Sequence, residues 1–193
     1  MHKWFHIVVL IALLSTGVLL GNHSDTVVTD DRGRFVCSAA RSSSGIWYTA
    51  QHCLRDGKLY VDGRNTPYAH LQGDIIQIGS DTRQSDKGIL TADRVRAGMQ
   101  VRVRIGGLSV LTDKPTYFEV ETKILAVYSS AELKYRLDAP DDAGWYALIR
   151  LGAFSGCSGS GVYHKGRLIG VISGGIANEY TFVALIPPAD AQR

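Results

Sequence analysis

The segment "GCSGSGV" at 156–162 places serines among glycines, a setting that suits a catalytic nucleophile. A serine hydroxyl is a weak nucleophile, and it attacks a carbonyl efficiently only when a nearby base takes its proton. Glycines around such a serine let the backbone turn sharply, so that N–H groups can converge on the oxyanion that forms. Because the same glycines also fit a flexible loop, the nucleophile hypothesis requires a base elsewhere in the chain.

Among the six histidines, His52 is the strongest candidate for that base. It lies in "WYTAQHCL", directly after an apolar run that predicts a strand and directly before Cys53. We interpret the other histidines, including His70 and His164, as surface or turn residues. The fold must therefore bring a histidine from the first half of the chain to a serine from the second.

The segments around His52 and Ser158 resemble the two catalytic motifs of chymotrypsin-like serine peptidases. "TAQHC" is similar to the TAAHC motif of this family, and "GCSGSGV" is similar to its GDSGGP loop, in the GxSGS form of some bacterial and viral members. In order and character, residues from about 34 to 189 resemble the protease domain of HtrA-type (Deg) enzymes. No PDZ-like segment follows "VALIPPADAQR", so we do not expect the regulation or trimer assembly of HtrA enzymes.

This resemblance implies an all-β fold of two six-stranded antiparallel β-barrels packed together. It also implies roles for individual residues. Ser158 would be the nucleophile, because it stands between Cys157 and Gly159 in the GxSG pattern. His52 would transfer the proton, and the backbone N–H groups of Gly156 and Ser158 would form the oxyanion hole.

A third residue, a carboxylate, would fix the tautomer and orientation of His52. Asp74 opens "DIIQI", which resembles the D-I-A-L-type strand of the family, and "DRVRAG" follows at a distance similar to that in HtrA-type enzymes. Asp86 opens "DKGIL", which has a similar shape, but Lys87 interrupts its apolar start. We prefer Asp74, which lies 22 residues after His52 and implies a shortened first barrel, and we keep Asp86 as the alternative.

The three cysteines are Cys37, Cys53 and Cys157. Cys37 and Cys53 are 16 residues apart, which resembles the disulfide that the family has beside its catalytic histidine. Cys157 takes the place of the aspartate that pairs with a freed N-terminus in trypsin-like zymogens, so we do not expect activation by N-terminal cleavage. We interpret it as a small buried thiol. We expect no metal site, since the cysteines include no CxxC pair, and no cofactor.

The N-terminus has the outline of an export signal. "MHKWFH" carries positive charge, and Ile7 to Leu20 contains no ionisable residue. A helix of these 14 residues would be about 21 Å long, shorter than a hydrocarbon core of about 30 Å. A cleaved signal peptide and a retained anchor helix that contacts the membrane through residues 4–20 therefore both stay open. We expect residues 1–24 to direct the chain out of the cytoplasm, so that it is periplasmic, secreted or anchored in a membrane and facing outside the cytoplasm.

Short alternating or apolar runs, separated by Gly, Asp, Asn and Pro, predict an all-β domain over residues 25–193. Among them, "QVRVRI" at 100–105 alternates with period two, as a half-buried strand should. "DGR" at 62–64 and "HKGR" at 164–167 predict hairpin turns. The polar segment "GSDTRQSDKG" at 79–88 divides the runs into two unequal sets. We expect an N-terminal barrel at about 25–80, a linker at about 79–90 and a C-terminal barrel at about 91–189.

Charge and composition limit the classes of partner. The 193 residues are 45% apolar, enough for a substantial core, and the net charge of +3 comes from 21 basic and 18 acidic residues. The basic residues are scattered and form no block that could follow a nucleic-acid backbone, so we do not expect a nucleic-acid partner.

Two segments resemble the substrate-binding parts of the family. Ser173, Gly174 and Gly175 resemble the strand that pairs with the substrate backbone and forms one wall of the S1 pocket. Gly152, six residues before Ser158, would lie near the pocket floor. Because no acidic residue lies there, we do not expect cleavage after Lys or Arg, and we expect a small or medium apolar P1 residue.

The order His, Asp, Ser predicts a serine endopeptidase that hydrolyses polypeptides through a Ser-His-Asp triad and an acyl-enzyme intermediate. The alternative, from a different functional class, is a catalytically silent chymotrypsin-like fold that acts as an exported peptide- or protein-binding module. The two hypotheses differ in whether a carboxylate reaches His52. The sequence makes no prediction of the oligomeric state.

Overall fold

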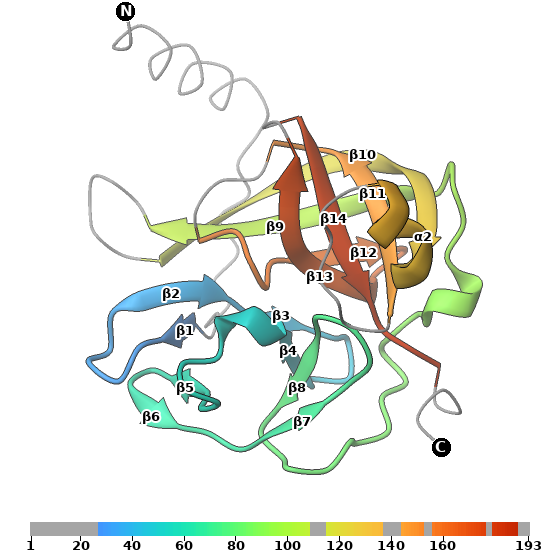
Figure 1. Ribbon diagram of the computed structural model, residues 1–193. Helices are drawn as coiled ribbons and strands as arrows, with labels where there is room; N and C mark the ends of the chain where they lie inside the picture. Colours follow the sequence, from blue (N-terminus) through green and yellow to red (C-terminus); the bar gives the residue numbers. More distant parts are fainter. Residues whose placement is uncertain (1–26, 109–114, 137–143, 153–155, 177–178, 189–193) are drawn as a thin grey trace, which may run out of the picture.

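The chain folds into two packed groups of β-strands, shown in Figure 1 as a computed structural model. The structure describes residues 27–108, 115–136, 144–152, 156–176 and 179–188. The predicted signal or anchor segment lies outside these residues. Within the described part of the chain, every helix is too short or too polar to span a bilayer.

The first group contains two four-stranded antiparallel sheets. In sheet order, the first has β2 (Phe35–Ser38), β1 (Val27–Thr29), β5 (Tyr60–Val61) and β6 (Arg64–Asn65), and the second has β3 (Ala40–Arg41), β4 (Trp47–Thr49), β8 (Ile76–Ile78) and β7 (Tyr68–His70). Only Ala39 separates β2 from β3, so one extended segment carries the chain from the first sheet into the second. A short 3₁₀-helix, η1 (Gln51–Cys53), follows β4.

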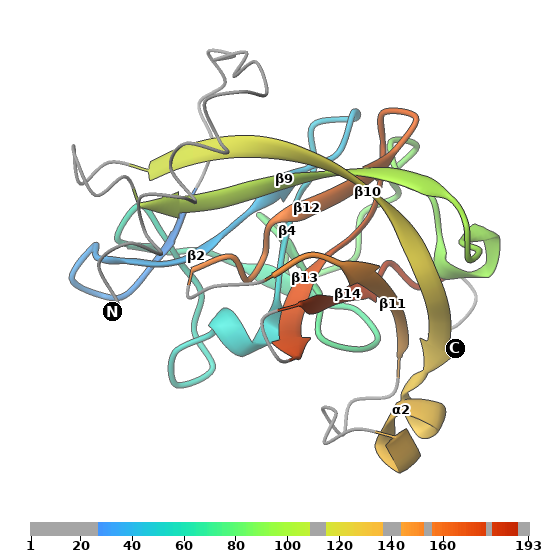
Figure 2. The same ribbon diagram turned by 90° about the horizontal axis from the view of Figure 1, so that it is seen from above.

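The second group is a closed antiparallel barrel of six strands. Its members, in the order in which they pair, are β10 (Pro115–Ser129), β11 (Trp145–Arg150), β14 (Tyr180–Leu185), β13 (Arg167–Ile176), β12 (Gly161–His164) and β9 (Gln100–Leu108). A 3₁₀-helix, η2 (Ala92–Arg94), precedes β9, and α2 (Ser130–Arg136) follows β10. Figure 2 shows the long strands β9 and β10 running side by side along one edge of the molecule.

The predicted all-β, two-barrel fold class is confirmed, with one difference in the first barrel. The second barrel has the expected six strands, whereas the described residues of the first half form short strands in two sheets. The physical reason is the length of chain available. Only 22 residues separate His52 from Asp74, and β5, β6 and β7 between them have two or three residues each.

Both predicted hairpin turns are confirmed. Val61 pairs with Arg64 around Asp62 and Gly63, and His164 pairs with Arg167 around Lys165 and Gly166. The two central residues of each turn have positive φ, as a two-residue type I′ turn requires.

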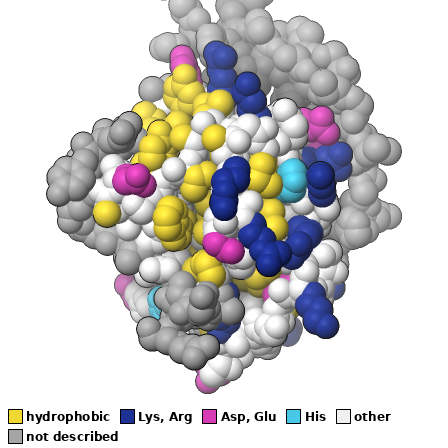
Figure 3. Space-filling model, turned by 90° about the vertical axis from the view of Figure 1, so that its right-hand side faces the viewer, with side chains coloured by type: hydrophobic (Ala, Val, Ile, Leu, Met, Phe, Trp, Pro, Cys, Tyr) yellow, Lys and Arg dark blue, Asp and Glu magenta, His cyan; other side chains and the backbone are white. Residues whose placement is uncertain are grey.

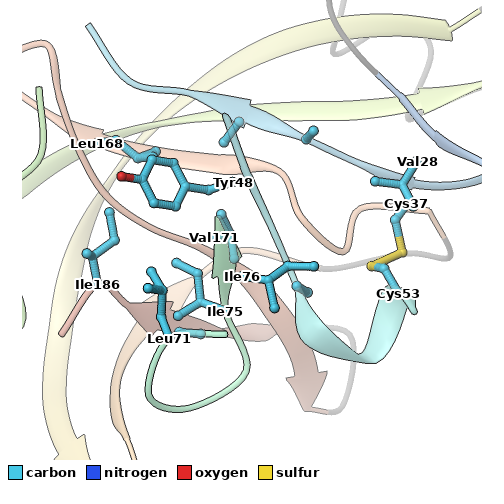
Figure 4. Close-up of a cluster of buried hydrophobic side chains, with 14 of the residues drawn as sticks. Val28, Cys37, Tyr48, Cys53, Leu71, Ile75, Ile76, Leu168, Val171 and Ile186 are labelled. Carbon is cyan, nitrogen blue, oxygen red and sulfur yellow. A yellow bond between two sulfur atoms is a disulfide. The ribbon is translucent and has the colours of Figure 1, made fainter. Parts of the chain in front are cut away.

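Two clusters of buried side chains hold the structure together. One fills the closed barrel and includes Cys157, which is buried as predicted. The other lies in the first half but also takes in side chains of the second, and Figure 4 shows Tyr48 and Ile76 in the same cluster as Leu168 and Ile186. Because both halves contribute side chains to this core, it fixes the position of the first half relative to the second.

The linker follows the second barrel closely. The Leu90 N–H donates to the Leu168 carbonyl at 2.8 Å, and the Leu168 N–H donates to the Gly88 carbonyl at 3.1 Å. The Arg83 guanidinium donates to the carbonyls of Pro187 and Pro188 near the end of the described chain. These contacts connect the linker to the start of β13 and to the segment that follows β14.

The predicted disulfide between Cys37 and Cys53 is confirmed. It joins β2 to η1, and Figure 4 shows it at the edge of the first cluster, beside Val28. Removing it as Cys37→Ala/Cys53→Ala should lower the free energy of unfolding by about 3 kcal/mol, because the cysteines close a loop with a sequence separation of 16.

Thermal unfolding measures this effect, and for a chain of this size the expected fall in Tm is roughly 6–12 °C. Unfolding the original protein in a reducing agent is the matched control, and its Tm should fall to that of the double variant. An unchanged Tm in the double variant would contradict the prediction.

Candidate active site

His52 lies in η1, where two features of the local chain position it. Its neighbour Cys53 is tied to β2 by the disulfide, and its own backbone N–H donates to Asp74 Oδ1 at 2.9 Å. The imidazole Nδ1 lies 2.7 Å from Asp74 Oδ2. The His52 side chain is 45% exposed, whereas that of Asp74 is 4% exposed, so a half-exposed ring rests on a buried carboxylate.

The other ring nitrogen, His52 Nε2, lies 2.8 Å from Ser158 Oγ. The loop that carries Ser158 is fixed from both halves of the molecule. The Ser38 N–H donates to the Ser158 carbonyl at 2.8 Å, and the Gly159 N–H donates to the Ile172 carbonyl at 2.9 Å. The structure thus brings the predicted histidine, aspartate and serine into one chain of hydrogen bonds.

Two glycines beside Ser158 are required by the space around them. Gly159 has φ +83°, and a Cβ added to it would come within 1.9 Å of the Ser38 carbonyl oxygen. Gly156 has φ +92°, and a Cβ there would come within 2.8 Å of the Phe35 ring. Larger residues do not fit at Gly156 and Gly159 because the loop packs directly against the first half of the molecule.

Asp74 is buried and receives several hydrogen bonds. Besides the backbone and ring of His52, the Ser173 hydroxyl donates to Asp74 Oδ2 at 2.5 Å. The Asp74 backbone N–H donates to the Tyr146 hydroxyl at 3.3 Å. The sequence predicted Ser173 as part of the substrate-binding wall but did not predict its hydrogen bond to Asp74. It did not predict the contact of Tyr146 with Asp74 either, because nothing near Tyr146 in the sequence indicates which residue its hydroxyl contacts.

The alternative carboxylate, Asp86, has different partners. The Tyr48 hydroxyl donates to Asp86 Oδ2 at 2.9 Å, and the Gly88 N–H donates to Asp86 Oδ1 at 2.6 Å. Burial is the largest cause that raises the pKa of Tyr48, and the hydrogen bond to the Asp86 carboxylate raises this pKa further. The Asp86 carboxylate therefore holds the linker on a core tyrosine and does not contact His52.

The predicted substrate-binding glycines lie where β13 pairs with β14. Gly174 pairs with Phe182, and Gly175 pairs with Thr181. A Cβ added to Gly174 would meet nothing within 4 Å, so there is open space beside this part of the strand. Gly152 is exposed, and residues 153–155 between it and Gly156 lie outside the described residues.

Thr181 was missed in the sequence analysis. Its side chain is fully buried, and its hydroxyl donates to the Leu151 carbonyl at 2.6 Å. It therefore connects β14 to the segment that leads to Gly152, opposite Gly175. No signal in the local sequence distinguishes it from other strand threonines.

One group of potential metal ligands occurs among the described residues: Cys37, His52 and Cys53. Both sulfur atoms of this group belong to the disulfide, so neither is a thiolate that could bind a metal.

No protein-family model matches the sequence, and no curated protein sequence matches it significantly. Solved structures, in contrast, resemble this one. Chymotrypsin from Cellulomonas bogoriensis superposes with a TM-score of 0.52 at 20% identity, over 83% of this chain and 88% of that one. The chain has the chymotrypsin-like fold.

Two further structures with this fold illustrate its range. The HtrA-type protease AlgW, solved with a decapeptide, has a TM-score of 0.53 at 16% identity, and the match covers 78% of this chain and 48% of AlgW. Human heparin binding protein has a TM-score of 0.55 at 14% identity, over 83% of this chain and 85% of its own. At these identities the likeness shows the chymotrypsin-like fold.

Proposed function

We propose that this protein is a serine endopeptidase that cleaves polypeptides through Ser158, His52 and Asp74. The observation that carries the proposal is the unbroken chain from Asp74 Oδ2 to His52 Nδ1, at 2.7 Å, and from His52 Nε2 to Ser158 Oγ, at 2.8 Å. The distance between Ser158 and His52 is in the range in which a proton can pass from nucleophile to base, and the distance between Asp74 and His52 is that of a hydrogen bond that orients the ring.

In the proposed mechanism, Ser158 Oγ attacks the carbonyl carbon of the scissile bond while His52 Nε2 takes its proton. The backbone N–H groups of Gly156 and Ser158 bind the oxyanion of the tetrahedral intermediate. His52 then donates the proton to the leaving amine, which gives an acyl-enzyme. Water, activated by the same imidazole, hydrolyses the ester and restores Ser158.

Asp74 acts in this mechanism by holding the imidazole. Its carboxylate accepts the Nδ1 hydrogen of His52, which leaves Nε2 as the acceptor that faces Ser158. The hydrogen bonds from the His52 backbone and the Ser173 hydroxyl hold the carboxylate in place. As His52 becomes positively charged during attack, the buried negative charge of Asp74 stabilises it.

A polypeptide substrate would bind in extended form along β13 at Ser173, Gly174 and Gly175. The open space beside Gly174 is compatible with an added backbone strand. AlgW has the same fold and was solved with a decapeptide, which is consistent with a peptide ligand for this chain.

Thr181 favours a small P1 residue in this proposal. Thr181 pairs with Gly175 in the strand ladder and its buried hydroxyl donates to the Leu151 carbonyl, so its side chain would take up space at the base of a P1 pocket formed by these two segments. Thr181→Gly should therefore raise the ratio of kcat/KM for Phe over Ala at P1 by roughly 10- to 200-fold. The measurement uses peptide substrates that differ only at P1, and Thr181→Ser, which keeps the hydroxyl, is the control. A higher kcat/KM of the original protein for Phe than for Ala at P1 would contradict this prediction.

We also propose that the chain is exported, with residues 1–24 as signal peptide or membrane anchor. The Cys37–Cys53 disulfide is consistent with an oxidising compartment outside the cytoplasm.

The direct test of the peptidase proposal is labelling with a fluorophosphonate probe, which reacts with serines activated by a base. We expect one labelled site, mapped by mass spectrometry to Ser158, and no labelling of Ser158→Ala. The proposal would be overturned if the protein showed the thermal unfolding of a folded, disulfide-bonded domain but took up no probe. That result would indicate a binding module.

A further inference from the structure

A second hollow lies between the two halves of the molecule, away from the triad. It is a groove of about 920 Å³, at the upper end of the range for ligand sites, lined by the turn between β3 and β4, by β9 and β10, and by the turn after β12. β12 begins at Gly161, soon after Ser158, and the groove lies at its other end, at His164. Figure 2 shows the turns after β3 and β12 on the side of the molecule opposite η1.

Basic side chains outnumber acidic ones in the lining of this groove. Its described lining contains four Lys or Arg side chains and two acidic ones: Arg41, Arg102, Arg104, Lys165, Glu119 and Glu121. Figure 3 shows Lys and Arg side chains concentrated in the centre and right-hand part of the face in view, with acidic side chains beside some of them. Both carboxylates contact the same cation, since Arg102 lies 3.5 Å from Glu119 and 3.3 Å from Glu121.

Arg41 is held in place by an aromatic ring and a carbonyl. Its guanidinium carbon lies 5.7 Å from the centre of the Trp47 ring, and its Nε donates to the Gly45 carbonyl at 3.3 Å. Among the described residues, no carboxylate lies within ion-pair distance of Arg41. A guanidinium fixed in this way presents its remaining N–H groups at low entropic cost, in the geometry that binds a carboxylate.

Lys165 is presented from the opposite wall by a rigid turn. It occupies the first central position of the type I′ turn with φ +47°, where Gly, Asn or Asp is usual. A residue other than Gly, Asn or Asp is uncommon at this backbone conformation. Within the described residues Lys165, too, has no carboxylate at ion-pair distance.

From these contacts we propose that the groove binds an acidic polypeptide segment, with carboxylates of the ligand on Arg41 and Lys165. The concave shape does not suit a flat membrane surface. Glu119 and Glu121 in the lining would repel a polymer that carries an anion on every unit, whereas a peptide can place uncharged residues there. The proposal is independent of the peptidase activity, because the groove does not include the triad.

The test is a fluorescence anisotropy titration with a labelled heptapeptide rich in Asp and Glu, beside the same peptide with Asn and Gln. The protein carries Ser158→Ala, so that the peptide stays intact whether or not the chain is a peptidase. We expect the acidic peptide to bind at least tenfold more tightly than the amide peptide. No binding of the acidic peptide up to about 1 mM would overturn the proposal.

Three pairs of substitutions then locate the binding. Arg41→Gln/Lys165→Gln should weaken it at least tenfold, whereas Lys58→Gln/Arg64→Gln, which removes the same charge outside the groove, should change it less than twofold. Glu119→Gln/Glu121→Gln should strengthen binding severalfold, a result that unfolding cannot produce. Equal losses in the first two pairs, or binding of a sulfated oligosaccharide in preference to the acidic peptide, would refute the assignment.

Discussion

Ser158→Ala and His52→Ala are each expected to lower kcat for peptide hydrolysis about 10⁶-fold, and the double substitution to lower it little further. The reason is that the hydroxyl and the imidazole act as one unit, with Ser158 Oγ 2.8 Å from His52 Nε2, so either loss removes the activated nucleophile. The measurement is steady-state hydrolysis of a peptide substrate with each single variant and the double variant.

His70→Ala is the matched control for this experiment. His70 is an exposed residue of β7 outside the triad, and kcat should stay within about twofold of the original value, as is usual for surface substitutions. If Ser158→Ala kept activity within tenfold of the original, another nucleophile would be responsible. If the two losses multiplied in the double variant, the serine and histidine would be acting independently.

Asp74→Asn is expected to lower kcat about 10⁴-fold with little change in the fold. An amide at this position can present an N–H to His52 Nδ1, which favours the tautomer with its proton on Nε2 and removes the base that faces Ser158. Asp86→Asn is the matched comparison, because it makes the same chemical change at the other carboxylate. Its kcat should stay within about threefold of the original, since Asp86 contacts Tyr48 and Gly88.

For the free energy of unfolding, in contrast to kcat, we expect a clear effect of Asp86→Asn. Asp86→Asn weakens the acceptor of the buried Tyr48 hydroxyl, so the free energy of unfolding should fall by about 1–3 kcal/mol. Chemical unfolding of both variants, run beside the kinetics, gives this comparison. A large loss of kcat with Asp86→Asn, together with a small loss with Asp74→Asn, would reverse the assignment of the third residue.

Local patterns in the sequence were sufficient for much of the fold. The positive φ values at Asp62–Gly63 and Lys165–Gly166 depend only on the residues of each turn, so both hairpins could be predicted. Alternating polarity in "QVRVRI" likewise predicted β9, because neighbouring side chains of a strand point to opposite faces. The motifs around His52 and Ser158 identified the residues that the fold brings to within 2.8 Å.

The sequence favoured Asp74 over Asp86 as the third residue, but local patterns could not decide between them. Both open a short apolar segment, and both are hydrogen-bonded in the structure, but only the path of the chain between them decides which reaches η1. The same holds for Tyr146 and Thr181, whose partners Asp74 and Leu151 are 72 and 30 residues distant. Their roles arise from contacts that form only when the second barrel closes.

By itself, then, the sequence determined the strand periodicity, the tight turns and the residue types of a candidate Ser-His-Asp triad, and the family resemblance implied the cysteine pair. The periodicity, the turns and the candidate residues depend on neighbouring residues or on a motif a few residues long. The tertiary structure alone decided which carboxylate meets His52, how the shortened first half divides into two sheets, and that Arg41 and Lys165 line the same groove. Those features depend on packing between segments far apart in the chain, where no local preference selects one partner over another.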